Sequence, residues 1–381
     1  MLTRNGWSVA ALAVVSLVLG ASLGYVELVA LGVAFALCLL LSGVWLALRP
    51  QLDVHRELSP TKVNEGDGAA GVLTVTNVGR RRCPPILAVE AFDGGSVTVP
   101  LAGLAPRTSH VASYRLPTDR RGCYAVGPLQ MGHADPFGLV SFSQAYGAEA
   151  TLWVYPRVHR VSPVPTGRSQ DIEGPTSAGA PRGGIAFHSL REYEPGDDPR
   201  LIHWRSTART GKMMVRHTVI TNEPRILVVL DTSLAPYADD SFEDAVRVAA
   251  SLVSVAAERR YPTDFRTTGG VSGTIDPTGH GRSDVFDKLA AVQPSTSDPG
   301  LAALTGLAAR RVQGVAAGVV TGQPSREQAN AVALVRGRFE MVTMVQVGER
   351  FDRPPIHVPG VLGVNAATSE DFVRIWKTRI G

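Results

Sequence analysis

The stretch RILVVLDTS at residues 225–233 decides the fold of the second half of the chain. It is a continuous run of apolar, largely β-branched residues, which is typical of a central parallel strand buried on both faces. Beyond it, stretches of helical periodicity alternate with short apolar runs. This alternation predicts a doubly wound α/β sheet, in which ligands lie at the carboxyl ends of the strands. Asp231, Thr232 and Ser233 lie at one such end.

The segments that follow are assigned by the same periodicity. Helices are predicted over residues 240–260, 285–292, 301–311, 326–338 and 370–379, and strands over residues 314–322, 341–348 and 361–367. The glycine-rich residues 268–273 predict a hairpin. There is no Walker A loop, no GxGxxG after a strand and no Gly-x-Ser-x-Gly around Ser233. The sequence therefore predicts no enzyme and no cofactor.

Residues 51–160 show short alternating segments instead. Six strands are predicted, over residues 72–78, 85–92, 96–101, 109–116, 123–132 and 150–156. Since the breaks hold turn residues and no helical stretch intervenes, this region predicts a β-sandwich. Residues 161–184, rich in Pro, Gly, Ser and Thr, predict a linker to a C-terminal region of residues 185–381.

Two apolar runs, at residues 7–25 and 28–48, precede these regions. Each is close to the ~20 residues that a helix needs to cross a bilayer. Neither run holds a charged residue, and Trp7, Tyr25 and Trp45 lie near the ends, where aromatic rings favour the membrane interface. Residues 1–50 thus predict a transmembrane helical hairpin in the lipid bilayer.

The flanking charges predict the orientation of this hairpin. Arg4 precedes the first run and Arg49 follows the second, whereas the joint between them holds neither Lys nor Arg. The positive-inside rule then places both ends in the cytoplasm. We expect a multi-pass protein of the plasma membrane whose soluble domains face the cytoplasm. The alternative, in which the first run is a cleaved signal peptide, leaves the second run as a stop-transfer segment and predicts the same topology.

Charge and cysteine content exclude two further classes. The net charge of +4 over 381 residues comes from scattered arginines, whereas a nucleic-acid partner would need Lys and Arg gathered on one face. Cys38, Cys83 and Cys123 show no CxxC spacing, which argues against a disulfide framework and a zinc site. A sparse set of this kind fits a reducing compartment.

The densest polar stretch is FHSLREYEPGDDPRLIHWRSTARTGKMMVR, at residues 187–216. A helix is predicted from Pro199, with Ile202 and Trp204 facing the body of the domain. Guanidinium groups suit carboxylate or phosphate partners, so one interpretation is a recognition surface. The other is an internal salt-bridged network that braces the domains. For the recognition surface we single out Arg191, Glu192, Tyr193, Gly196, Asp197, Arg200, Trp204 and Arg209.

Four stretches resemble a known family. RGCYAVGP at residues 121–128, DPFGL at 135–139 and VYPR at 154–157 resemble the β-region of bacterial proteins of domain-of-unknown-function family 58. LREYEPGDDPRLIHWRSTAR at residues 190–209 resembles the core signature of that family. The resemblance implies a C-terminal domain of von Willebrand factor type A kind. It also implies a MoxR-type AAA+ ATPase as partner, often with a transglutaminase-like membrane protein, and a chaperone-like or assembly role.

Type A domains often hold a divalent cation on an Asp-x-Ser-x-Ser motif. Asp231 and Ser233 match this motif, but Ala235 stands at the second serine position. Thr321 stands where the resemblance implies an aspartate, and the threonine ligand would come from residue 296 or from Ser297. We therefore expect a degenerate site that holds no metal.

The function expected from the sequence is that of a membrane-anchored cytoplasmic adaptor. One alternative is a metal-dependent adhesion or receptor module. A second is a hydrolase of the cell envelope, which would need an outward-facing domain.

Overall fold

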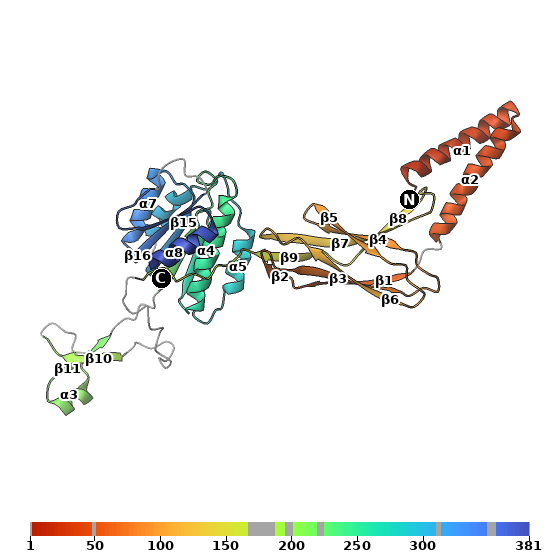
Figure 1. Ribbon diagram of the computed structural model, residues 1–381. Coiled ribbons are helices and arrows are strands. Elements are labelled where there is room, and N and C mark those ends of the chain that lie inside the picture. The colour runs from red at the N-terminus through yellow and green to blue at the C-terminus, as the bar shows by residue number, and fades with distance from the viewer. Residues whose placement is uncertain are drawn as a thin grey trace. The chain divides into compact units, whose positions relative to one another are not determined.

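The computed structural model describes residues 2–47, 51–166, 187–194, 201–218, 225–309, 314–348 and 356–380 (Figure 1). The chain divides into two compact units, Met1–Arg157 and Val158–Gly381. The first unit holds the two N-terminal helices and the β-strands that follow them, and the second holds the α/β sheet.

Helices α1 (Arg4–Leu23) and α2 (Val26–Ala47) are both long and apolar enough to cross a membrane. Thr3 caps α1 by accepting the backbone N–H of Gly6 on its hydroxyl oxygen (3.0 Å). Small residues let the two helices approach closely, since a Cβ on Gly20 would lie 2.7 Å from the backbone nitrogen of Val29. The prediction of two apolar N-terminal helices is confirmed.

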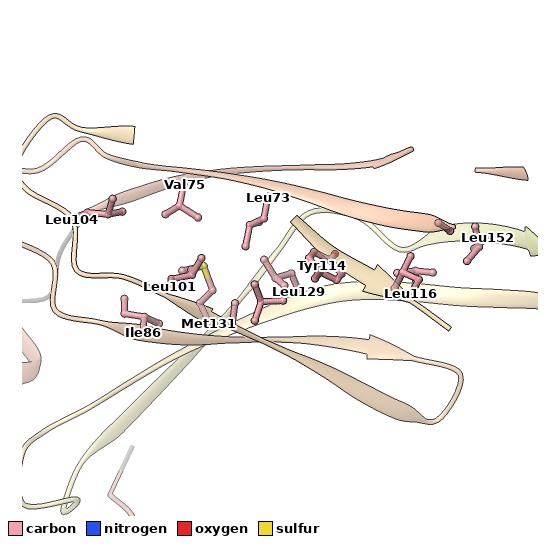
Figure 2. Packing of buried hydrophobic residues seen from close by; sticks show 14 of the residues in the cluster. Leu73, Val75, Ile86, Leu101, Leu104, Tyr114, Leu116, Leu129, Met131 and Leu152 are labelled. Atoms are coloured by element: carbon pink, nitrogen blue, oxygen red, sulfur yellow. The ribbon is translucent and has the colours of Figure 1, made fainter. Parts of the chain in front are cut away.

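Two β-sheets follow the helices. The first has the order β1 (Leu52–Ser59), β3 (Ala69–Asn77), β6 (Ser109–Leu116), with antiparallel pairing throughout. The second has the order β2 (Lys62–Asn64), β9 (Ala150–Tyr155), β7 (Gly122–Ala134), β4 (Ile86–Phe92), β5 (Gly95–Leu101), and β8 (Ser141–Tyr146) pairs with β7. Inward residues of both sheets form one core (Figure 2), in which Leu73, Leu129 and Leu152 are fully buried. The six predicted strands are present, and β1, β2 and β8 were missed.

The two sheets are also joined by a buried ion pair. Arg56 on β1 pairs with Glu90 on β4, and their side chains are 5% and 0% exposed. Tyr114 on β6 donates its hydroxyl to Oε2 of Glu90 (2.5 Å), and Arg56 donates to the carbonyl of Val126 (3.2 Å). Burial and the hydrogen bond to Glu90 raise the pKa of Tyr114, so its hydroxyl stays a donor. This cluster ties the first sheet to the second through polar groups.

The second unit is built on a six-stranded sheet. Its order is β14 (Ser272–Ile275), β13 (Thr263–Thr267), β12 (Ile226–Leu230), β15 (Gly314–Thr321), β16 (Phe339–Val347), β17 (Leu362–Ala366), and all neighbours are parallel except β13 and β14. The helices are α4 (Ser241–Glu258), α5 (Arg282–Ala291), the 3₁₀ turn Gly300–Ala303, α6 (Leu304–Ala309), α7 (Arg326–Arg336) and α8 (Ser369–Ile380).

Helices cover both faces of this sheet. Leu227 and Val229 of β12 share a core with Val332 and other residues of α7. On the other face, a Cβ on Gly318 of β15 would lie 3.4 Å from Leu252 of α4. Figure 1 shows α4 and α7 on opposite sides of the sheet. The doubly wound α/β sheet is therefore present, and its strand order reverses between β12 and β15.

The described start of the predicted linker packs against this second unit. The indole of Trp376 on α8 donates to the carbonyl of Ser162 (2.7 Å), and the hydroxyl of Ser251 on α4 accepts the backbone N–H of His159 (2.9 Å). Val164 is 1% exposed. Residues 161–166 thus belong to the α/β unit, while residues 167–184 of the predicted linker lie outside the described residues.

Candidate functional site

The segment predicted as a recognition surface forms a small β–α–β module. Strand β10 (Phe187–Glu192) pairs antiparallel with β11 (Met214–Thr218), and α3 (Trp204–Thr210) lies between them in sequence. His203 caps α3, since its Nδ1 accepts the backbone N–H of Ser206 (3.3 Å). The backbone N–H of Met214 donates to the hydroxyl of Thr207 (3.0 Å), which fastens the helix to β11.

Large apolar side chains of α3 and of the residues on either side of it in sequence are exposed to solvent. Trp204 is 68% exposed, Leu201 41% and Met213 49%, whereas Ile202 is 8% exposed and forms a β-bridge with Val215. The prediction that Trp204 faces the body of the domain is wrong. Helix α3 begins at Trp204, while Ile202 before it is held by β11 and the indole of Trp204 is exposed.

The same module exposes basic side chains. Arg205 and Arg209 are exposed, and neither forms an ion pair with a carboxylate among the described residues. Lys212 pairs with Glu192 of β10, whose hydrogen bond and charge raise the pKa of the lysine. The described residues of α3 and its neighbours therefore expose both apolar and basic side chains.

Only part of the predicted recognition surface lies within the described residues. Glu192 pairs with Lys212, and the backbone N–H of Tyr193 donates to the carbonyl of Met213 (2.8 Å). Trp204 and Arg209 lie on α3, while only the backbone of Arg191 is described, paired with Val215. The predicted Gly196, Asp197 and Arg200 lie outside the described residues. Sequence reasoning missed Leu201, Lys212 and Met213. Gly211, at φ 70°, ends α3 and turns the chain back, so that Met213 meets the end of β10. This glycine was the signal in the sequence that could have predicted the turn.

A second polar cluster lies at the carboxyl ends of β12, β13 and β15. Asp231, fully buried, accepts the backbone N–H (3.0 Å) and the hydroxyl (2.7 Å) of Ser233 on Oδ1. Its Oδ2 accepts the hydroxyl of Thr321 (2.8 Å), at the end of β15. The hydroxyl of Thr268, just after β13, lies 3.3 Å from Oδ1 of Asp231. One carboxylate thus joins three strand ends at the point where the strand order reverses.

Asp298 extends the cluster. Its Oδ2 accepts the hydroxyls of Thr268 (2.8 Å) and Thr232 (2.5 Å), and its Oδ1 accepts the backbone N–H of Gly300 (2.8 Å). Gly300 has φ +62°, and a Cβ there would lie 2.7 Å from the hydroxyl of Ser233. The turn 298–300 therefore needs glycine both for its backbone conformation and for space.

The electrostatics of this cluster follow from burial. Desolvation raises the pKa of Asp231, although the hydrogen bonds from Ser233 and Thr321 act in the opposite direction. Tyr237 donates its hydroxyl to the carbonyl of Asp231 (2.7 Å), and burial together with the two aspartates raises its pKa well above the ordinary value. The phenol therefore remains a neutral donor.

The residues present do not fit a type A cation site. Both carboxylate oxygens of Asp231 already accept hydrogen bonds from protein groups, and Thr321 supplies a donor where an acidic ligand would be needed. Ala235 adds no oxygen, and no three His, Cys, Asp or Glu side chains gather in the described part of the chain. The third hydroxyl beside Asp231, after those of Ser233 and Thr321, belongs to Thr268, whereas the predicted Ser297 is exposed and bonds to Ser295. Thr268 and Asp298 were missed, because they come from loops that only the tertiary fold brings together.

The fold and these sites define a chain with two apolar N-terminal helices, a β-sandwich and a doubly wound α/β domain. Residues 189–377 match the family model described as "Protein of unknown function DUF58". The resemblance expected for residues 190–209 is thereby confirmed, and the match does not reach the stretches at residues 121–157.

Among curated proteins, the chain is 25% identical over 236 residues to the uncharacterized protein YeaD of Bacillus subtilis (strain 168). The match covers 58% of this chain and 57% of the Bacillus protein, so the chain spans less than two thirds of that relative.

Solved structures similar to part of the chain include the CARDB domain of the PF1109 protein of Pyrococcus furiosus, at 20% identity, covering 28% of this chain and 92% of that one, with a TM-score of 0.20. The alkylpurine DNA glycosylase AlkC of Pseudomonas fluorescens matches at 15% identity, covering 30% of this chain and 34% of that one, with a TM-score of 0.20. Similarity at these TM-scores carries no inference about function.

Proposed function

We propose that this chain is a membrane-anchored docking protein of the DUF58 family, which presents the β10–α3–β11 module to a protein partner. The observation that carries the proposal is the exposed Trp204, in a module that also exposes the apolar Leu201 and Met213 and the basic Arg205 and Arg209. Trp and Arg are the residues that most often dominate the binding energy of protein interfaces. An indole that is 68% exposed buries little apolar surface and so adds little to the stability of the module itself.

The anchor in this proposal is the α1–α2 hairpin. Its helices meet the length and composition of membrane spans, and most of their large apolar side chains are exposed. Both ends of the hairpin would lie in the cytoplasm, since Arg4 flanks one end and Arg49 the other. This topology would hold both soluble units at the inner face of the plasma membrane.

The partner that we propose is a MoxR-type AAA+ ATPase, on the basis of the family resemblance, with a transglutaminase-like membrane protein as a further component. The α/β domain would be of the von Willebrand factor A kind, since Asp231 and Ser233 lie at the carboxyl end of β12 beside the reversal in strand order. In this role the domain is a rigid support, and the docking surface is the module.

The test compares capture of the ATPase by full-length variants in detergent micelles. Trp204→Ala and Arg209→Ala are each expected to weaken binding, and a Trp at an interface hot spot contributes about 2 kcal/mol or more, close to thirtyfold in Kd. The matched control is Leu334→Ala, which removes an apolar side chain that is 55% exposed on α7 of the same unit.

Three outcomes count against the proposal in different ways. Equal binding by Trp204→Ala and wild type removes the module from the docking surface. A lowered melting temperature in Trp204→Ala shows that the indole stabilises the fold. Failure of the wild type to bind any MoxR-type ATPase overturns the partner, and mass spectrometry of proteins that co-purify from membranes then identifies the alternative.

A further inference from the structure

The turn between β7 and β8, residues 135–140 (DPFGLV), is joined to the start of helix α1. The backbone N–H of Thr3 donates to the carbonyl of Leu139 (2.9 Å), and the hydroxyl of Thr3 donates to the carbonyl of Gly138 (2.7 Å). Leu2 forms a β-bridge with Val140. A Cβ on Gly6 would overlap the carbonyl oxygen of Leu139, so the first turn of α1 lies directly against residues 138–140.

The same turn is joined to helix α2 through a buried carboxylate. Ser42, 1% exposed, donates its hydroxyl to Oδ2 of Asp135 (2.8 Å). Asp135 also accepts the backbone N–H groups of Phe137 (3.0 Å) and Val140 (2.6 Å). Burial disfavours the charged form, but the hydrogen bonds from Val140, Ser42 and Phe137 outweigh it and lower the pKa of Asp135. The carboxylate stays ionised and holds the turn in shape.

These contacts place the turn at a defined level along the hairpin. Trp7, 67% exposed, directly follows Gly6, and Trp45, 45% exposed, lies one helical turn beyond Ser42. Because a helix rises ~1.5 Å per residue, both indoles lie within about 5 Å, along the helix axes, of the residues that the turn contacts. Indole rings favour the boundary between lipid tails and headgroups. If the hairpin is inserted, the turn lies at that boundary.

The tip of the turn carries an aromatic side chain that the protein leaves uncovered. Phe137 is 61% exposed, and Leu2 beside the turn is 39% exposed. A single exposed apolar residue is ordinary on a soluble surface. What sets Phe137 apart is that three hydrogen bonds of Asp135 and two of Thr3 fix its turn against the ends of two helices of membrane-spanning length.

We propose that the turn of residues 135–140 is a lipid contact, in which the ring of Phe137 enters the headgroup region of the bilayer and the Asp135–Ser42 bond positions it there. This inference rests on the proposed insertion of α1 and α2 in the membrane. The occupant is the interface of a phospholipid bilayer. The sandwich is then attached to the membrane surface by its own turn as well as by the chain that leaves α2.

The test uses full-length protein in vesicles of phosphatidylethanolamine and phosphatidylglycerol, with lipids brominated in the upper acyl chain as quenchers. A fluorescent bimane is attached to a single cysteine in three versions of the protein, in which the other native cysteines are replaced by serine. The versions carry Phe137→Cys, Val111→Cys and the native Cys38. Val111 is the matched control, because it is also 61% exposed and lies on the outer edge strand β6.

The expected result is that brominated lipid removes most of the fluorescence at positions 137 and 38 and leaves that at position 111 nearly unchanged. Quenching at position 38 without quenching at position 137 overturns the lipid contact and leaves the membrane anchor standing. Absence of quenching at position 38 overturns the anchor, and the lipid contact with it.

A second pair of variants tests the positioning bond. Ser42→Ala, in the Phe137→Cys protein, should lower the quenching at position 137. The matched control is Ser22→Ala, which removes an exposed hydroxyl that bonds only to the carbonyl of Leu19 near the other end of α1. Equal quenching in both variants overturns the role of the Asp135–Ser42 bond.

Discussion

The buried ion pair between Arg56 and Glu90 makes the sharpest prediction about stability. Glu90→Ala removes the acceptor of Tyr114. Among the described residues, it leaves the guanidinium of Arg56, whose side chain is 5% exposed, with only the carbonyls of Val126 and Ala148. Removing one partner of a buried pair costs about 3–5 kcal/mol, because the other charge stays desolvated. We expect Glu90→Ala to lower the free energy of unfolding of the sandwich by that amount.

A graded series separates charge from shape. Glu90→Gln keeps the side-chain volume and one acceptor oxygen, so its cost should be smaller, about 1–3 kcal/mol. The triple change Arg56→Met, Glu90→Leu and Tyr114→Phe removes every member of the cluster at similar volume. Since replacing a whole buried pair by apolar groups is often close to neutral, the triple variant should be more stable than Glu90→Ala.

Cys83 supplies a reporter inside the sandwich core. Its thiol is 2% exposed, and burial raises its pKa, so it reacts only when the sandwich opens. In protein that lacks Cys38 and Cys123, the rate of thiol labelling against urea gives the opening free energy. A loss of 3–5 kcal/mol raises that rate by about two to three and a half orders of magnitude. An unchanged labelling rate in Glu90→Ala refutes the reasoning, as does a triple variant less stable than the single one.

Three further outcomes follow from the α/β unit. Gly300→Ala forces a Cβ to 2.7 Å from the hydroxyl of Ser233 at φ +62° and should cost about 1–3 kcal/mol, seen as a lower melting temperature by calorimetry. Burial raises the pKa of Asp231, so the folded chain binds more protons than the unfolded one between the ordinary aspartate pKa and the raised value. The free energy of unfolding should therefore fall as the pH rises through that window. Urea titrations at several pH values measure this slope, and Asp231→Asn should abolish it. Trp376→Phe loses the hydrogen bond to the carbonyl of Ser162 and should cost about 1 kcal/mol, with earlier proteolysis near residue 162 as the measure.

Periodicity was sufficient to predict most of the helices and strands of the α/β half. Strand β12 is five consecutive buried residues, and α4 buries its apolar stripe against the sheet, so both are visible in local sequence. Strand β13 was missed because its sequence TDFRT carries Asp264 and Arg266. Asp264 is held by Arg225, at 3.2 Å, from the start of β12. A charge that is satisfied by a neighbouring strand looks like a surface charge when the sequence is read alone.

The same cause hid strand β1. Its burial alternates along Leu52–Ser59, and Arg56 occupies an inward position, which in an alternating strand usually holds an apolar residue. The guanidinium is satisfied there by Glu90, which itself lies within an otherwise apolar strand. Sequence spacing could not pair the two residues, because their contact depends on how one sheet lies over the other.

The candidate sites show which residues could be predicted from local sequence and which could not. Asp231 and Ser233 were expected at the carboxyl end of a strand, and the family resemblance placed Thr321 in the same candidate site; the contacts of Asp231 with both residues have this arrangement. The third hydroxyl came from Thr268 and not from residues 296–297, since the choice depends on which loop bends over the sheet. In the β10–α3–β11 module, Ile202 was correctly expected inside, but Trp204 is exposed, since local sequence does not show which side of a short helix its neighbours cover.

Three carboxylates share one role across the chain. Glu90 joins two sheets, Asp231 joins strand ends, and Asp135 joins a turn to a helix. Each is less than 5% exposed, and each is satisfied by donors that come from other elements. Burying such a group without these donors would cost several kcal/mol, so its presence requires the partner elements to be in place. An acidic residue inside an apolar pattern therefore marks a junction, and Asp135 marks the junction that would bring the sandwich to the membrane surface.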